Sequence, residues 1–130
     1  MANYKLTPEI VDIVYGLLSS ITVPKYKQSR PSLAKLGEFI VVNSLPIDRD
    51  VMQSCSVNVN YYAKDIDGGS NIGYVPDLIK LTAGAKLVLN ILEKVSNTEY
   101  LIDFDRSETI QDREKEHFIG LRFSFKYINN

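Results

Sequence analysis

The final stretch of the chain, from His117 to Tyr127, alternates between apolar and polar side chains. Successive side chains of a β-strand point to opposite faces, so this alternation predicts a long antiparallel strand with one buried face. The buried face would consist of Ile119, Leu121, Phe123, Phe125 and Tyr127. The other face would carry Arg122 and Lys126, which either lie in solvent or contact a neighbouring subunit. This strand leads us to expect a chain built for packing and pairing rather than around a catalytic loop.

The composition predicts one globular domain. The 130 residues have the usual size of a domain, and no linker, repeat or low-complexity segment divides them, so we expect a single domain over residues 1–130. The 15 basic and 16 acidic residues leave a net charge of -1, which gives no signal for sequence-independent binding to nucleic acid. No apolar run has the length of a signal peptide or of the roughly 20 residues that span a bilayer, so no membrane contact is expected.

Two segments have the spacing of apolar residues that predicts an amphipathic helix. The first runs from Pro8 to Ser20, with Thr7 as its N-cap. The second opens at Pro76-Asp77. Its apolar stripe would consist of Leu78, Leu81, Ala85, Val88, Leu89 and Leu92. Gly84 lies within this helix and lowers its stability by about 1 kcal/mol relative to alanine. A glycine at this position therefore indicates that another backbone approaches closely there.

Apolar and β-branched residues predict three further strands. Glu38–Leu45 is suited to burial on both faces, and Val51–Lys64 alternates well enough to pair with it as a hairpin. Tyr100–Asp105 predicts a short strand, which a polar and acidic excursion from Arg106 to Glu116 separates from the terminal strand. The order α-β-β-α-β-β favours an α+β domain with an antiparallel β-sheet and both helices packed on one face.

Two predicted connections hold residues suited to contacts with other molecules. The connection from Ile21 to Gly37 contains the basic cluster, which consists of Lys25, Lys27, Arg30 and Lys35. These side chains either lie in solvent or contact phosphate or an acidic partner surface. The segment from Asp65 to Gly73 has turn chemistry throughout and supplies two more candidate contacts, Asp65 and Asp67.

Two D-x-D pairs are the main indication of a chemical site: Asp65 with Asp67, and Asp103 with Asp105. Alternating carboxylates of a strand share one face and supply the oxygen ligands that Mg²⁺ or Ca²⁺ requires. If the four carboxylates converge, they predict a small metal-dependent hydrolase or nuclease. The alternative is a solvated turn and a polar strand face, because the EF-hand pattern is missing.

Other enzyme classes find no support in the sequence. His117 is the only histidine, which excludes catalytic and metal sites that need a second imidazole. Cys55 is the only cysteine, so no disulfide and no thiolate cluster is expected, and a small residue at the edge of a strand is its simplest role. No phosphate-binding glycine motif occurs. We therefore expect no catalytic residue and no cofactor.

The segment from Cys55 to Asp65, followed by a helix and by a hairpin that ends in an alternating strand, resembles small tail-completion proteins of tailed bacteriophages. These are often called tail terminator or minor tail proteins. The resemblance rests on a strand of the type V-x-V-x-x-x-A-K-D, matched here by Val57, Val59, Ala63, Lys64 and Asp65. In that family an N-terminal helix leads into an antiparallel sheet, and the order of elements along this chain is similar.

The resemblance implies a structural virion component of a phage or prophage, without catalytic residues. Such a protein would form a homo-oligomeric ring, commonly of six subunits, that caps the tail tube and meets the head connector, while DNA passes through its lumen. Its place would be the virion tail, after assembly in the host cytoplasm. The Lys25 to Lys35 connection and the Asp65 to Gly73 turn would then contact ring neighbours or the tube. A different head-tail joining or assembly factor is an alternative with the same fold-level likeness.

Overall fold

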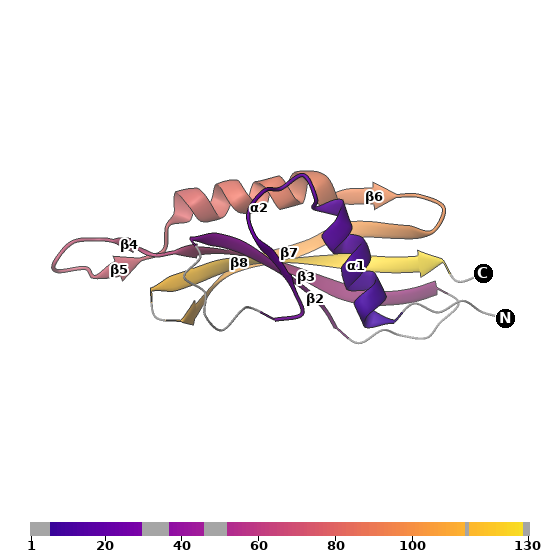
Figure 1. Cartoon of the computed structure of the whole chain (residues 1–130), viewed down its shortest axis with the longest axis horizontal. Helices are drawn as coiled ribbons and strands as arrows, with labels where there is room; N and C mark the ends of the chain where they lie inside the picture. The colour runs from indigo at the N-terminus through magenta and orange to yellow at the C-terminus, as the bar shows by residue number, and fades with distance from the viewer. Residues whose placement is uncertain (1–5, 30–36, 46–51, 114, 129–130) are drawn as a thin grey trace.

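Both helices cover the same face of one six-stranded sheet (Figure 1). The computed structural model describes residues 6–29, 37–45, 52–113 and 115–128. In chain order the elements are α1 (Thr7–Leu17), β1 (Lys25–Lys27), β2 (Glu38–Ser44), β3 (Met52–Lys64), β4 (Ile66–Asp67), β5 (Tyr74–Val75), α2 (Leu78–Leu92), β6 (Lys94–Ser96), β7 (Tyr100–Arg113) and β8 (Glu116–Ile128). The sheet order is β1-β2-β3-β8-β7-β6, and β4 pairs with β5. The predicted α+β fold is confirmed.

Helix α1 buries an apolar stripe against the sheet, made of Ile10, Val11 and Val14. The carboxylate of Glu9 accepts a hydrogen bond from the backbone N–H of Leu6 at 3.3 Å. Leu6 is therefore the cap residue, and the predicted cap, Thr7, is the first residue of the helix. The helix ends at Leu17, before the predicted Ser20, because its last turn closes with hydrogen bonds that reach three residues back instead of four.

Helix α2 begins after Asp77, whose carboxylate accepts a hydrogen bond from the backbone N–H of Lys80 at 3.1 Å. Its buried stripe is close to the predicted one and consists of Leu81, Gly84, Ala85, Val88 and Leu92. Leu78 differs, because it lies in the first turn, beyond the end of this stripe, and is 58% exposed. The close approach predicted at Gly84 occurs, but it comes from the ring of Tyr61 on β3 and not from a backbone. Neither helix in the described part of the chain is long and apolar enough to cross a bilayer.

The terminal strand β8 lies between β3 and β7 and pairs antiparallel with both. Its alternation is as predicted, because one face lies in the main core beneath the helices. The residues of β8 buried there are Leu121, Phe123, Phe125 and Tyr127. β3 pairs antiparallel with β2 and adds Val57 and Val59 to the same core, which confirms the predicted hairpin. Cys55 lies within β3, not at the edge of a strand, and packs against this core.

A second, smaller core lies on the other face of the sheet. Phe39, Val41 and Tyr62 are buried there, which confirms that β2 is covered on both faces. A row of aromatic rings crosses four strands on this face, in the order Tyr26, Phe39, Tyr62 and Phe118, with successive ring centroids 6.1, 4.4 and 4.7 Å apart. We call these four residues the aromatic row. It anchors β1 and β2 to the centre of the sheet by side-chain packing in addition to backbone pairing.

Two segments predicted as connections contain strands. β1 lies inside the predicted connection from Ile21 to Gly37 and pairs parallel with β2, so the sheet is mixed and not wholly antiparallel. β7 continues to Arg113 through residues predicted as a polar excursion, because the long partner β8 offers backbone groups along this whole stretch. A bulge between Phe104 and Arg106 interrupts the pairing at Asp105. The predicted alternation that would place Asp105 on the face of Asp103 is therefore broken.

Candidate interaction surfaces

Residues 66–75 form an arm that leads away from the end of the sheet (Figure 1). β4 and β5 are joined by two residue pairs. The turn between them closes through a hydrogen bond from the N–H of Gly68 to the carbonyl of Gly73 at 2.7 Å, and the φ of Gly73 is 81°, which favours glycine. The turn predicted from Asp65 to Gly73 is thus present, but it joins a short strand pair, of which β4 lies inside the predicted range and β5 directly follows it.

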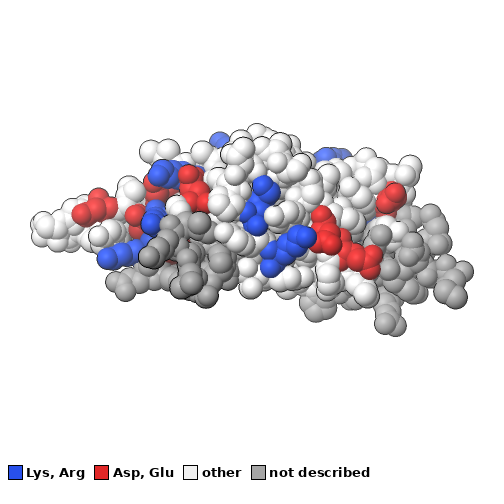
Figure 2. Space-filling model, viewed as in Figure 1, with Lys and Arg blue, Asp and Glu red and all other residues white. Residues whose placement is uncertain are grey.

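Large apolar side chains are exposed on the arm and at the start of α2. They are Ile66, Ile72, Tyr74, Leu78 and Ile79, and we call them the arm surface. Ile72 is 71% exposed and Ile79 is 85% exposed. Asp67 is the only charged residue between positions 66 and 75, and Figure 2 shows the outer part of the arm as white apart from one red area. Several large apolar side chains exposed in one region of the molecule are typical of a contact with another protein.

The root of the arm is held by Asp65 and His117. Asp65 Oδ1 lies 2.7 Å from His117 Nδ1, and the Asp65 side chain is only 3% exposed. The backbone N–H of Asp65 also donates to the carbonyl of Lys115 at 2.9 Å, and Lys115 Nζ lies 4.3 Å from the centroid of the Tyr74 ring. A pocket of about 410 Å³ opens beside these residues. Asp65, a predicted contact residue, is therefore part of the joint that fixes the arm to the start of β8.

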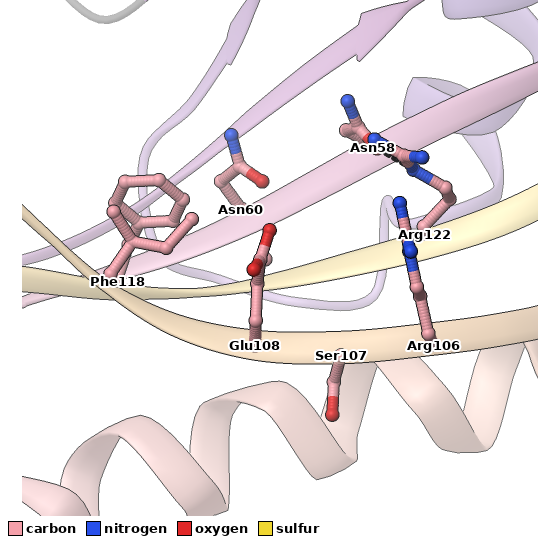
Figure 3. Close-up of a pocket in the computed structure, with 9 residues that line it drawn as sticks. Asn58, Asn60, Arg106, Ser107, Glu108, Phe118 and Arg122 are labelled. Carbon is pink, nitrogen blue, oxygen red and sulfur yellow. Dashed lines mark hydrogen bonds between the residues drawn. The ribbon is translucent and has the colours of Figure 1, made fainter.

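A second pocket, of about 140 Å³, opens on the face of the sheet that the helices leave uncovered, over β3, β8 and β7 (Figure 3). Its lining includes Asn58, Arg106, Glu108, Ile110, Phe118 and Arg122, and we call it the arginine pocket. Arg106 and Arg122 are direct cross-strand partners. Arg122 Nε donates to Asn58 Oδ1 at 3.3 Å, whereas Arg106 has no hydrogen-bond or ion-pair partner in the part of the chain that the structure describes. Like charges directly opposite each other on a sheet are unfavourable unless an anion lies between them.

β7 has an open edge beside this pocket. β6 pairs with β7 only through Leu101–Asp103, and one further backbone bond reaches Phe104. From Arg106 onwards, β8 is the one neighbour of β7 among the described strands. The outward backbone groups of this stretch are therefore available to an extended segment of another chain.

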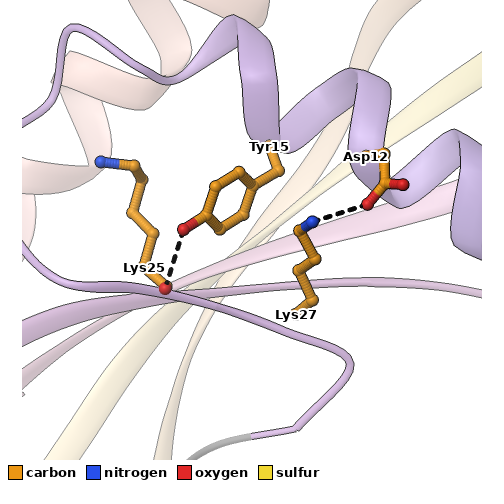
Figure 4. A network of polar contacts seen from close by, with 4 residues as sticks. All are labelled: Asp12, Tyr15, Lys25 and Lys27. Atoms are coloured by element: carbon orange, nitrogen blue, oxygen red, sulfur yellow. Dashed lines mark hydrogen bonds and ion pairs between the residues drawn. The ribbon is translucent and has the colours of Figure 1, made fainter.

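The basic residues Lys25 and Lys27 make contacts within the molecule (Figure 4). Lys27 Nζ lies 2.7 Å from Asp12 Oδ1 on α1 and 4.7 Å from the centroid of the Tyr15 ring. The hydrogen bond to Asp12 raises the pKa of the Lys27 ammonium above its ordinary value. Lys25 Nζ donates to the carbonyl of Ile21, and the Tyr15 hydroxyl donates to the carbonyl of Lys25 at 3.2 Å. These bonds fix β1 against α1.

The other predicted contact residues are spread over the molecule. Asp67 lies on the arm, and Arg122 lines the arginine pocket. Lys126 is exposed further along β8, on the same face as Arg122. Arg30 and Lys35 lie outside the described residues. The sequence missed Arg106 and the pocket, because residues 106–113 were predicted as a polar excursion; the alternation of Arg106, Glu108 and Ile110 was the available signal.

The structure does not bring the two D-x-D pairs together. Asp103 is aligned through Ser124 with Ser56 of β3, whereas Asp65 follows the far end of β3. These two positions are nine residues apart in the sequence, which corresponds to about 30 Å of extended strand. Within residues 6–29, 37–45, 52–113 and 115–128, no group of three or more His, Cys, Asp or Glu side chains is placed to hold a metal ion. The four carboxylates therefore do not form the converged site that a metal-dependent hydrolase would need.

Neither a protein-family model nor a curated protein matches the sequence of this chain. The arrangement of its own side chains is therefore the basis for assigning a function. Two features stand out: the arm surface, and the arginine pocket beside the open edge of β7.

Proposed function

We propose that this protein is a structural subunit that assembles with copies of itself into a ring, in the manner of the tail terminator proteins that its sequence resembles. The ring caps the tail tube of a phage or prophage and joins it to the head connector, and DNA passes through its lumen. The protein is assembled in the host cytoplasm and becomes part of the virion tail. The observation that carries this proposal is the arm surface.

The arm is suited to contact with another copy and not with its own sheet. It leads away from the body of the molecule (Figure 1), and its exposed apolar side chains are accessible to a neighbour. A strand pair of two residues is too short to be stable without further packing, and association supplies that packing. A contact between an arm and a different surface of the next copy is heterologous, and heterologous contacts close into rings when the rotation between subunits allows it.

The distribution of charge supports the part of the proposal that concerns DNA. The net charge is -1, and on the face shown in Figure 2 basic and acidic areas are interspersed. A strongly basic surface would bind the phosphate backbone and hold it. An interspersed surface lets DNA pass through a ring without being retained.

Native mass spectrometry and light scattering of the full chain test the proposed assembly. The expected result is a closed oligomer of defined size, which Ile72→Ser shifts towards the monomer by removing an exposed apolar side chain from the arm. The matched control is Leu6→Ser, because Leu6 is 66% exposed but lies before α1 and not on the arm. A wild-type protein that stays strictly monomeric at high concentration, both alone and with tube protein, would overturn the proposal.

A second experiment tests the proposed place in the virion. The genes on either side of this one are expected to encode capsid, connector and tail-tube proteins. The purified ring is expected to bind the tail-tube protein encoded nearby in a pull-down. Because this binding requires the assembled ring, Ile72→Ser is expected to reduce it. Neighbouring genes of unrelated function, together with no binding to any tube protein, would remove the phage assignment while leaving self-association open to its own test.

A further inference from the structure

We infer that the arginine pocket is the acceptor for the arm of a second copy of this chain, and that the carboxylate of Asp67 binds between Arg106 and Arg122. This inference rests on the proposed self-association and names the surface on which it takes place. It assigns both halves of the contact to one chain, so that each subunit donates an arm to one neighbour and accepts an arm from the other.

The pocket has the donors for an anion, and no acidic side chain among the described residues is bonded to Arg106 or Arg122. Arg106 and Arg122 stand directly opposite each other on β7 and β8, with their side chains on the same face (Figure 3). Asn58 accepts one bond from Arg122, which leaves further guanidinium N–H groups of Arg122 and all those of Arg106 without a partner among the described residues. Guanidinium groups form paired, charge-assisted hydrogen bonds with a carboxylate or a phosphate. An anion placed between them would also relieve their repulsion.

The rest of the lining favours a protein segment over nucleic acid. Glu108 lies in the same pocket and would repel a run of phosphates. Ile110 and Phe118 are cross-strand partners and form an apolar end of the pocket, which a sugar-phosphate backbone has no group to fill. The pocket volume of about 140 Å³ is close to that of a cavity of about 150 Å³ that accommodates benzene, so one aromatic or branched side chain fits.

Backbone pairing is available at the same place. Beyond Arg106, the outer edge of β7 has no strand paired with it among the described elements. β4 and β5 also pair only with each other, so each has a second edge to offer. A strand added to an open sheet edge gains main-chain hydrogen bonds, while its alternate side chains enter neighbouring pockets.

The arm carries the side chains that this pocket requires. Asp67 and Tyr74 are cross-strand partners and therefore lie on the same face of the arm. Asp67 is its one charge, opposite in sign to the arginine pair, and Tyr74 is half exposed and brings a benzene-sized ring beside it. One face of the arm thus presents a carboxylate for Arg106 and Arg122 together with a ring for the apolar end of the pocket, made by Ile110 and Phe118.

Charge exchange in the full chain tests this contact. Asp67→Arg and Arg106→Glu are each expected to raise the protein concentration required for assembly by at least about tenfold, because each places like charges in the contact. A one-to-one mixture of the two variants is expected to assemble again. In the mixture every arm faces a pocket of opposite charge at position 106, so native mass spectrometry should show oligomers in which the two variants alternate in equal number.

Three further variants serve as controls. Asp67 Oδ1 also accepts a hydrogen bond from the N–H of Gly69 at 2.9 Å, so Asp67→Asn removes the charge while keeping the turn. Arg106→Gln serves if Arg106→Glu fails to fold, and it is expected to weaken assembly by a smaller factor. Lys126→Glu reverses an exposed charge on the same face of β8 outside the pocket, and it is expected to leave assembly unchanged.

The outcomes separate this inference from the proposed function. If Arg106→Glu and Arg106→Gln assembled at the same protein concentration as the wild type, the assignment of the acceptor site would be wrong, and the proposed self-association would stand. Loss of assembly in both charge variants without recovery in the mixture would overturn the pairing of Asp67 with Arg106. A wild-type monomer would overturn both proposals. If Arg106→Gln weakened binding of a duplex oligonucleotide and left assembly unchanged, the pocket would be a phosphate site and the inference would be wrong.

Discussion

The ring of Tyr61, on β3, occupies the space in which a side chain at Gly84, on α2, would lie. Helix and sheet approach each other here more closely than any residue with a Cβ permits. The Tyr61 hydroxyl then donates a hydrogen bond to Glu38 Oε1 on β2 at 2.9 Å. One buried side chain thus sets the distance between α2 and the sheet and also links two of the strands.

Gly84→Ala is expected to destabilise the protein by up to about 2 kcal/mol in urea denaturation. Alanine gains about 1 kcal/mol of helix propensity, but the added methyl displaces a buried ring, and overpacking of this kind costs about 1–3 kcal/mol. The matched control is Gly16→Ala in α1, where nothing lies within 4 Å of an added Cβ. It is expected to be neutral or to stabilise by up to about 1 kcal/mol. A stabilised Gly84→Ala variant would contradict the close approach.

The contribution of Tyr61 to stability is expected to decline above about pH 10. Burial, together with the hydrogen bond to Glu38 and its negative charge, raises the pKa of the Tyr61 hydroxyl above its ordinary value. The unfolded chain loses this proton near pH 10, whereas the folded protein retains it, so the stabilisation is complete below pH 10 and is lost as the pH rises towards the folded pKa.

Tyr61→Phe provides the comparison for this pH dependence. At pH 8 the variant is expected to be about 1 kcal/mol less stable than wild type, because it lacks the hydrogen bond to Glu38. This difference in stability between the two proteins should become smaller between pH 10 and pH 11, as measured by their denaturation midpoints. A gap that stays constant over this range would show that Tyr61 ionises alike in the folded and unfolded chains.

Asp77→Ala is expected to lower the free energy of unfolding by about 1 kcal/mol through the loss of the cap on α2. The Asp77 carboxylate accepts a hydrogen bond from the Lys80 N–H, and alanine leaves this group unsatisfied. Asp77→Asn keeps an acceptor at this position, so thermal unfolding should show a smaller loss. Equal losses in the two variants would mean that the negative charge, and not the hydrogen bond, stabilises the helix.

Phe39→Ala is expected to lower the free energy of unfolding by about 3–5 kcal/mol, as large-to-small substitutions of buried aromatic residues do. The Phe39 ring is fully buried and stacks on Tyr62 with ring centroids 4.4 Å apart, away from the helices. Phe118→Ala, at the half-buried end of the aromatic row, should cost less. If Phe39→Ala costs under about 1 kcal/mol in chemical denaturation, the second core contributes little to the cooperative fold.

Titration with Mg²⁺, Mn²⁺ or Ca²⁺ is expected to release no heat of binding in calorimetry. Asp65 is paired with His117, and Asp103 lies about 30 Å away along the sheet, so no site among the described residues offers the several oxygen ligands that these ions require. Saturable heat that disappears in both Asp65→Asn and Asp103→Asn would show that the carboxylates meet in a form of the protein other than the one described.

The sequence predicted the elements whose side chains follow a local period. β8 was recognised from the alternation of Leu121, Phe123 and Phe125, and α2 from its buried stripe, because periods of 2 and 3.6 residues are set by the backbone of each element alone. Burial of β2 on both faces was also predicted, because a strand formed by a continuous apolar run has no polar face for contact with water.

Strands and contacts that depend on residues distant in the sequence were determined only by the tertiary structure. The polar half of β7 became a strand because β8 lies beside it, and β1 formed because β2 offered a parallel edge. The pairing of Asp65 with His117 joins residues 52 positions apart, and Arg106 meets Arg122 only after the bulge at Asp105 has reset the register. No local period records such contacts, so the alternation of Arg106, Glu108 and Ile110 could indicate a strand but not the arginine pocket.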